Sequence, residues 1–95
     1  MFLGSYRYEG DPALLLAAYE KLVGSFDTAP FTLHACAVDE AGITVLDACP
    51  DEATFRAFST SPDWQTACAS MGLPPAVVTP IGEIHRIHAS DLVPT

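Results

Sequence analysis

The sequence has very few cations. It contains one lysine, Lys21, and three arginines, Arg7, Arg56 and Arg86, against twelve acidic residues, and its formal net charge is −8. Proteins that bind nucleic acid or anionic lipid need clustered positive charge at the surface that meets the phosphates. The composition therefore predicts that this acidic chain binds neither nucleic acid nor a membrane surface.

Long apolar runs and disulfide-type cysteine patterns are also missing. No stretch of 18 apolar residues occurs, and the N-terminus MFLGSYRYEG lacks the basic and apolar regions of a signal peptide. The three cysteines, Cys36, Cys49 and Cys68, show no CxxC spacing and are odd in number, which is typical of reduced thiols. We therefore expect a cytoplasmic protein.

The length is that of one small domain. A chain of 95 residues is too short for two domains, and we expect a single domain over 1–95 with its core at about 2–88 and a loose tail at 89–95. Charged residues make up only 17% of the chain and apolar residues 49%. So small a polar fraction indicates apolar area in a subunit interface, and we expect a homodimer.

Hydrophobic spacing predicts the order βαββαβ. The expected strands are at 2–8, 31–38, 43–49 and about 77–88, and the expected helices are at 12–23, from 50 onward, and at about 62–71. Asp11 and Ser61 are suited to cap helices, since each precedes a proline at the first helical position. In the first helix a core-facing stripe is formed by Leu15, Ala18, Tyr19 and Leu22. With right-handed crossovers, this order gives an α+β ferredoxin-like fold, a four-stranded antiparallel sheet with its helices on one face.

The short loop at 39–42 fixes a register for the central hairpin. The opposed pairs are Val38–Ile43, Cys36–Val45, His34–Asp47 and Thr32–Cys49. One face then carries small apolar residues, which we expect to lie beneath the helices: Leu33, Ala35, Ala37, Thr44, Leu46 and Ala48. The other face, expected to point toward a partner or a cavity, carries His34, Cys36, Val38, Val45, Asp47 and Cys49.

His34 and Asp47 are the candidate catalytic residues. Directly opposed residues have Cβ atoms about 4.5–5.5 Å apart, and a carboxylate at that range orients an imidazole as a general base. A structural hydrogen bond between two half-buried groups is the competing interpretation, and a different register is the third. Cys36 and Cys49 lie roughly 13 Å apart along the strands, too far to share a metal ion or a disulfide, so no metal or cofactor is predicted.

Further residues could line a ligand cavity beside this pair. Tyr6 and Tyr8 share one face of the first strand, where core or interface packing is the alternative. His85 reaches the same cavity if it faces inward, and is otherwise a surface histidine. The predicted ligand-binding set is Tyr6, Tyr8, Cys36, Val45, Cys49 and His85.

Residues 46–65 resemble a stretch of the dimeric α/β-barrel superfamily, in its branch similar to antibiotic-biosynthesis monooxygenases. The likeness lies in Asp51-Glu52 at a helix start, in Phe55 and Phe58, and in the SPDWQ turn at 61–65. It implies a dimer in which two sheets face each other around a barrel-like cavity. Relatives include cofactor-free oxygenases, isomerases and haem-degrading enzymes, but the asparagine used by the last group is absent from this chain.

Two classes of function follow. The first is an enzyme or binder of a small apolar or aromatic molecule, oxygenase-like or isomerase-like, with His34 and Asp47 as its acid–base pair and a cavity of several hundred Å³. The second is a non-catalytic dimerisation or ligand-sensing module. The first requires a ligand cavity next to His34, and the second only an interface.

Overall fold

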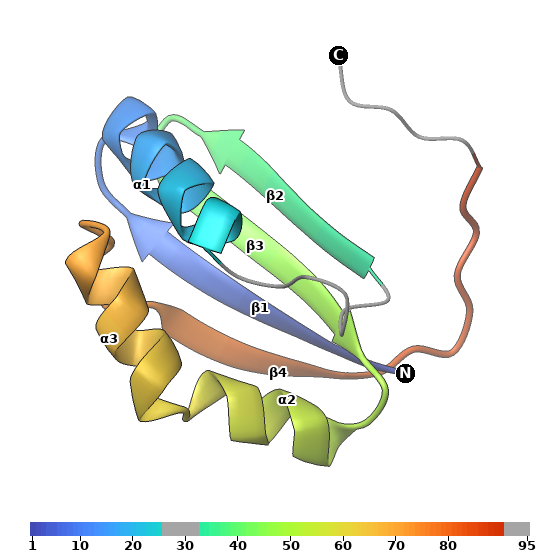
Figure 1. Ribbon diagram of the computed structural model, residues 1–95. Helices are drawn as coiled ribbons and strands as arrows, with labels where there is room; N and C mark the ends of the chain where they lie inside the picture. Colours follow the sequence, from blue (N-terminus) through green and yellow to red (C-terminus); the bar gives the residue numbers. More distant parts are fainter. Residues whose placement is uncertain (26–32, 91–95) are drawn as a thin grey trace.

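A computed structural model describes residues 1–25 and 33–90 of the chain. Its elements are β1 (Phe2–Glu9), α1 (Pro12–Ser25), β2 (Leu33–Asp39), β3 (Gly42–Cys49), α2 (Glu52–Ser59), α3 (Pro62–Ser70) and β4 (Val77–Glu83). The strands form one antiparallel sheet in the spatial order β2-β3-β1-β4. The helices cover one side of this sheet (Figure 1), which confirms the α+β ferredoxin-like architecture.

Capping side chains start the helices where the sequence predicts. Asp11, Asp51 and Ser61 each accept a hydrogen bond from a backbone N–H of the first turn, at 2.9, 2.7 and 3.4 Å. These bonds satisfy donors that have no partner within the helix. Since Ser61 and Pro62 begin a new helix, the segment is divided into α2 and α3 as expected.

The hairpin register is confirmed over its described length. His34 pairs with Asp47, Cys36 with Val45, and the remaining described pairs follow the same alignment. The predicted partner of Cys49, Thr32, lies outside the described residues, as does the predicted start of that strand at 31.

Our prediction of which sheet face lies beneath the helices was wrong. The buried side of the sheet carries His34, Val45 and Asp47, together with Tyr6 and Tyr8 from β1. These side chains fill the space between sheet and helices, so the helices rest on large residues. The expectation that small residues mark the covered face failed because β1 supplies its aromatic side chains to the same side as His34.

Aromatic rings form the centre of the core. The ring of Tyr6 lies 5.9 Å from that of Phe55 and 5.1 Å from that of Trp64, and Phe58 lies 5.2 Å from Trp64. Tilted pairs at such distances add about 0.5–1.5 kcal/mol each beyond area burial. They attach α2 and α3 to β1, while the predicted stripe of α1 is buried over the other half of the sheet.

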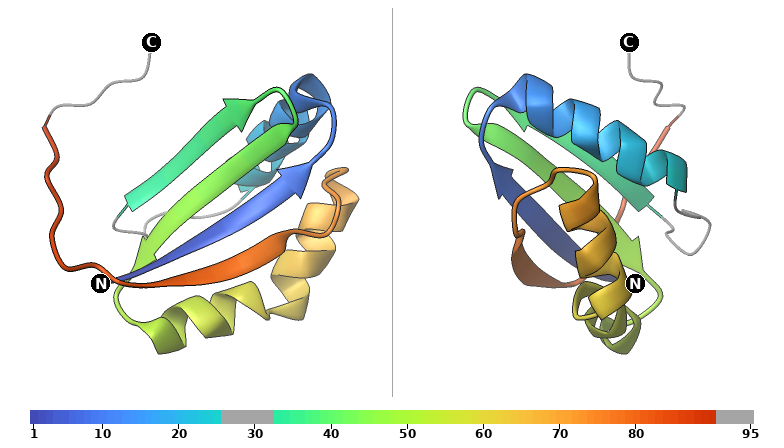
Figure 2. Two further views of the ribbon diagram at one scale, coloured as in Figure 1. Left: turned by 180° about the vertical axis from the view of Figure 1, so that it is seen from behind. Right: turned by 60° about the vertical axis from the view of Figure 1, so that its left-hand side comes forward.

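No helix of residues 1–25 and 33–90 lies on the opposite side of the sheet, and Figure 2 shows the strands from that side in the view from behind. Because side chains alternate along a strand, this side carries the apolar residues Leu3, Leu33, Ala35, Ala37, Leu46 and Val77 and the polar residues Ser5, Arg7, Thr44 and Thr79. Val77 is 62% exposed, and Ala35 and Ala37 are exposed too. The uncovered side therefore has exposed apolar residues among polar ones, and we refer to it as the open face.

The last strand is shorter than predicted. It ends at Glu83, not His88, because its partner β1 begins at Phe2, which is opposite Glu83. The N–H of Ile84 makes one more hydrogen bond, 2.7 Å to the carbonyl of Met1. Residues 85–90 are exposed and lead away from the sheet (Figure 1).

Candidate active site

Three side chains from three elements form a hydrogen-bonded chain beneath α1. Tyr19 of α1 contacts His34 of β2 through its hydroxyl, 2.5 Å from Nε2. Nδ1 of the same imidazole is hydrogen-bonded to Asp47 of β3. The hairpin register places His34 opposite Asp47, and the helix sets its tyrosine above them. The result is a continuous path for protons from a phenol through an imidazole to a carboxylate.

The imidazole is held on both sides. Its ring is parallel to that of Tyr19 within 5°, with ring centres 5.9 Å apart. Asp47 is only 2% exposed, and a carboxylate so buried requires a hydrogen-bonded partner. With a neutral imidazole, Nδ1–H donates to Asp47 and Nε2 accepts the proton of Tyr19. This tautomer satisfies the three groups together and leaves lone pairs of the phenol oxygen for a ligand.

Burial keeps the tyrosine neutral. It raises the pKa of Tyr19 to about 12, with smaller contributions from Cys36, Glu20 and Asp47. Near pH 7 the phenol therefore carries its proton and donates it to His34. A group in this state can take a proton from a ligand only while it passes its own to the imidazole, which couples the two transfers.

The hydroxyl of a second tyrosine, Tyr6, belongs to the same site as Tyr19, His34 and Asp47. Tyr6 is 1% exposed, and its hydroxyl has no hydrogen-bond partner among the described residues. Burial raises the pKa of Tyr6, and the neighbouring Asp47 raises it further, so this group is a neutral donor. A buried hydroxyl without a partner costs about 1–3 kcal/mol, and an acceptor on a ligand would remove that cost.

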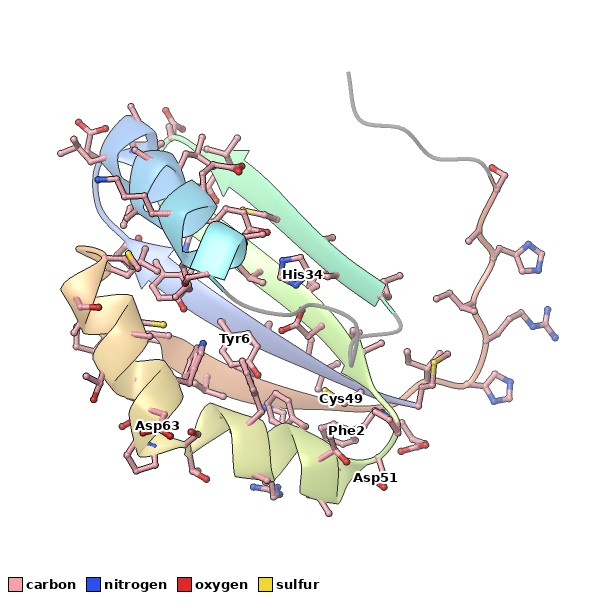
Figure 3. The ribbon with its side chains drawn as sticks, viewed as in Figure 1. Phe2, Tyr6, His34, Cys49, Asp51 and Asp63 are labelled. Carbon is pink, nitrogen blue, oxygen red and sulfur yellow. The ribbon has the colours of Figure 1, made fainter. Side chains whose placement is uncertain are left out.

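These residues surround a small cavity between α1 and the α2–α3 pair. In Figure 3 the side chains of His34 and Tyr6 lie on the helix-covered side of the sheet. The cavity has a volume of about 40 Å³ and is lined by Tyr6, Tyr8, Tyr19, Leu22, Val23, His34, Val45, Asp47, Phe58 and Trp64. Such a volume holds a few water-sized groups, so it admits one functional group of a ligand and not a whole metabolite.

No family model, curated protein or solved structure matches the chain. The resemblance of residues 46–65 to the dimeric α/β-barrel superfamily therefore stays a prediction, and the site is interpreted from its own geometry. In residues 1–25 and 33–90, no helix has the length and hydropathy needed to cross a bilayer. That part of the chain also contains no group of three or more side chains arranged to hold a metal ion.

The predicted site residues separate into two groups. His34 and Asp47 are joined, and Tyr6, Tyr8 and Val45 line the same cavity. They do so beneath the helices, not on the open face where we expected them. Among residues 1–25 and 33–90, the space beside His34 is a cavity of about 40 Å³ and not the expected few hundred Å³, because aromatic side chains fill it.

The remaining predicted residues do not line this cavity. Cys36 is half-buried two positions along β2 from His34, and Cys49 is buried opposite Phe2. Burial raises the pKa of both thiols, so they are protonated and weakly nucleophilic. His85 is exposed beyond the end of β4.

Tyr19 was not predicted as a site residue. The sequence placed it correctly in the buried stripe of the first helix, where it is the one residue with a polar group. A buried tyrosine hydroxyl usually has a hydrogen-bond partner, so a hydrogen bond from Tyr19 to another buried polar group could have been predicted. The sequence did not identify His34, because contact between a helix and a strand depends on the tertiary packing.

Proposed function

We propose that this protein catalyses proton transfer at the carbonyl end of a small, largely apolar molecule, with that end alone inside the cavity, as an isomerase or a cofactor-free oxygenase would require. The observation that carries the proposal is the hydrogen-bonded chain Tyr19–His34–Asp47, with the unpartnered hydroxyl of Tyr6 on the same cavity. Buried acid–base groups with a hydrogen-bonded supporting residue are typical of catalytic sites.

The proposed step is removal of a proton from the carbon next to the carbonyl. The C–H bond breaks, and its electron pair forms the carbon–carbon double bond of an enolate. The proton goes to the oxygen of Tyr19, whose own proton passes to Nε2 of His34. The imidazolium is then stabilised by Asp47, and the enolate oxygen accepts a hydrogen bond from Tyr6. If the enolate is conjugated with a second carbon–carbon double bond, return of the proton to the far carbon of that bond gives an isomer, and no other reactant is needed.

Deuterium exchange tests this step without knowledge of the natural substrate. The purified chain would be incubated with 2-tetralone in D₂O, and loss of the proton signal next to the carbonyl would be followed by NMR. We expect exchange faster than in protein-free buffer, and Tyr19→Phe and His34→Gln should lower the rate by about 10²-fold or more, the usual contribution of general acid–base catalysis.

The controls separate chemistry from folding. His88→Gln changes an exposed histidine outside the cavity and should leave the rate as it is. Tyr6→Phe removes the oxyanion donor and should slow exchange while Tyr19 and His34 stay in place. Exchange no faster than in buffer, or a rate unchanged in a folded Tyr19→Phe variant, would refute the proposal.

Self-association is the second proposal, and the observation that favours it is the open face. Exposed apolar residues there lie at both edges of the sheet, Ala35 and Ala37 on β2 and Val77 on β4, with Arg7 and Thr44 in the row between Ala37 and Val77. Exposed apolar residues on a sheet surface that no helix of residues 1–25 and 33–90 covers are typical of protein interfaces, and a second copy of the chain would cover them as the family resemblance implies. Self-association through the open face would also fit the alternative function, a non-catalytic dimerisation or ligand-sensing module.

A further inference from the structure

A second, larger cavity lies on the other side of Tyr8 and Trp64. It has a volume of about 330 Å³ and is bounded by α3, by the connection from α3 to β4, and by the first residues of β4. This volume is within the range of small-molecule sites. Tyr8 and Trp64 line both cavities, so a molecule bound here touches the wall of the candidate active site.

The walls of this cavity determine what it can bind. Apolar groups come from Leu73, Pro74, Pro75 and Val78, and none of the described residues that line the cavity has a charged side chain. An ionised ligand would lose its hydration there without a compensating partner. The molecule that fits is neutral and mostly apolar.

One polar group in the cavity lacks a strong partner. The hydroxyl of Tyr8 is buried, and it contacts the thiol of Cys68, with 3.9 Å between oxygen and sulfur. A thiol is a weak donor and a weak acceptor. Burial raises the pKa of both groups, so Tyr8 presents a neutral O–H to this space.

We infer that the cavity between α3 and β4 is a binding site for a neutral, mostly apolar molecule whose carbonyl or ether oxygen accepts a hydrogen bond from Tyr8. The site is separate from the chain Tyr19–His34–Asp47, and its existence does not depend on proton transfer at His34.

Two probes with the same carbon skeleton test the role of Tyr8. The first is 1-tetralone, a neutral bicyclic ketone, and the second is tetralin, which lacks the carbonyl oxygen. Trp64 is the single tryptophan of the chain, so its indole N–H gives one NMR signal that reports on this wall. We expect 1-tetralone to shift that signal and to bind about threefold to tenfold more tightly than tetralin, as one added hydrogen bond would provide.

Variants locate the site. Tyr8→Phe should reduce the affinity for 1-tetralone to that for tetralin. Ala69→Leu fills part of the cavity and should weaken both probes, whereas Ala57→Leu on the exposed side of α2 should weaken neither. His34→Gln should leave binding intact, which separates this site from the proposed chemistry. Equal affinity of the wild type for 1-tetralone and tetralin, or binding unchanged in a folded Ala69→Leu variant, would overturn the inference.

Discussion

The ring of Phe55 lies directly over Gly4, in the space that a side chain at that position would occupy. A Cβ atom at position 4 would lie 2.0 Å from Cε1 of Phe55, and the side chain of Phe55 is only 1% exposed. Gly4→Ala must therefore displace a ring at the centre of the core, and we expect the free energy of unfolding to fall by about 1–3 kcal/mol. Urea denaturation of the variant and the wild type would measure this change in the free energy of unfolding.

The control for this substitution is Gly24→Ala. Gly24 is within α1 and has open space around it, so alanine should be neutral or stabilising there by up to about 1 kcal/mol. Combining Gly4→Ala with Phe55→Leu should recover part of the loss. Equal stability of Gly4→Ala and wild type would contradict the packing described for Phe55.

The chain Tyr19–His34–Asp47 also contributes to stability. Removing the imidazole in His34→Ala leaves a carboxylate that is 2% exposed without its partner, and we expect a cost of about 3–5 kcal/mol. Tyr19→Phe removes one hydrogen bond and should cost about 0.5–1.5 kcal/mol. Thermal unfolding of both variants tests this order, and the reverse order would show that Asp47 does not depend on His34.

The tyrosines should resist ionisation in the folded protein. The chain has three, Tyr6, Tyr8 and Tyr19, and burial raises the pKa of each, that of Tyr19 to about 12. A tyrosine in an unfolded chain has a pKa near 10. At that pH the unfolded chain releases protons that the folded chain retains, so stability falls as the pH rises above about 10.

Ultraviolet absorbance of the phenolate is the measurement. Native protein at about pH 10 should show almost no tyrosinate, whereas the same protein in urea should be close to half-ionised. Ionisation of the native protein should appear only together with unfolding. A native titration midpoint near 10 for all three groups would contradict the burial of these hydroxyls.

Acid should weaken the turn between β2 and β3. Asp39 makes two hydrogen bonds to the guanidinium of Arg7, 2.8 and 3.0 Å long, and accepts the backbone N–H groups of Ala41 and Gly42. The guanidinium contact, followed by the turn, lowers the pKa of Asp39 to about 2. A lowered carboxyl pKa stabilises the fold above the unfolded value of about 3.9, and this contribution is lost as the pH falls toward 2.

The variant Asp39→Asn tests this dependence. Its urea midpoint should be lower than that of the wild type at pH 7, and the difference should shrink as the pH falls from about 4 to about 2. Asparagine still offers an oxygen to the turn, so the comparison isolates the charge. A difference that stays constant over this range would exclude the ion pair with Arg7 as its source.

The open face should determine the state of association. The wild type is expected to sediment with twice the 10.1 kDa mass of one chain. Leu46→Asp places a carboxylate within the apolar surface of the sheet and should give a folded monomer. Leu14→Asp, at a position on α1 that is 71% exposed, should leave the mass unchanged. A wild-type protein that sediments as a monomer would contradict self-association.

Turn length and capping residues were enough to predict most local structure. The loop at 39–42 determined which residues of β2 and β3 are opposed, so the pair His34–Asp47 followed from the sequence. The sequence did not predict which side of the hairpin faces the helices. Alternation along a strand separates two faces but does not say which of them is covered. That depends on β1, whose Tyr6 and Tyr8 lie on the side of His34.

The candidate site could be predicted only in part for the same reason. His34 and Asp47 belong to one hairpin, and their contact is local. Tyr19 reaches them from a helix across the interior, and the unpartnered hydroxyl of Tyr6 becomes evident only when its surroundings are known. The two cavities depend on how α1 and α3 pack over the sheet, which no short segment encodes.

The groups proposed to move protons all come from the first 47 residues, and apart from Tyr8 the walls of the larger cavity come from residues 59–78. Substitutions in the second half of the chain can therefore change the shape and size of the molecule that the larger cavity binds while the acid–base groups stay as they are. In laboratory evolution, binding in the larger cavity and the rate of proton transfer should be adjustable in separate libraries, one for each half of the chain. Trp64 and Tyr8, which touch both spaces, are the positions where the two properties should change together.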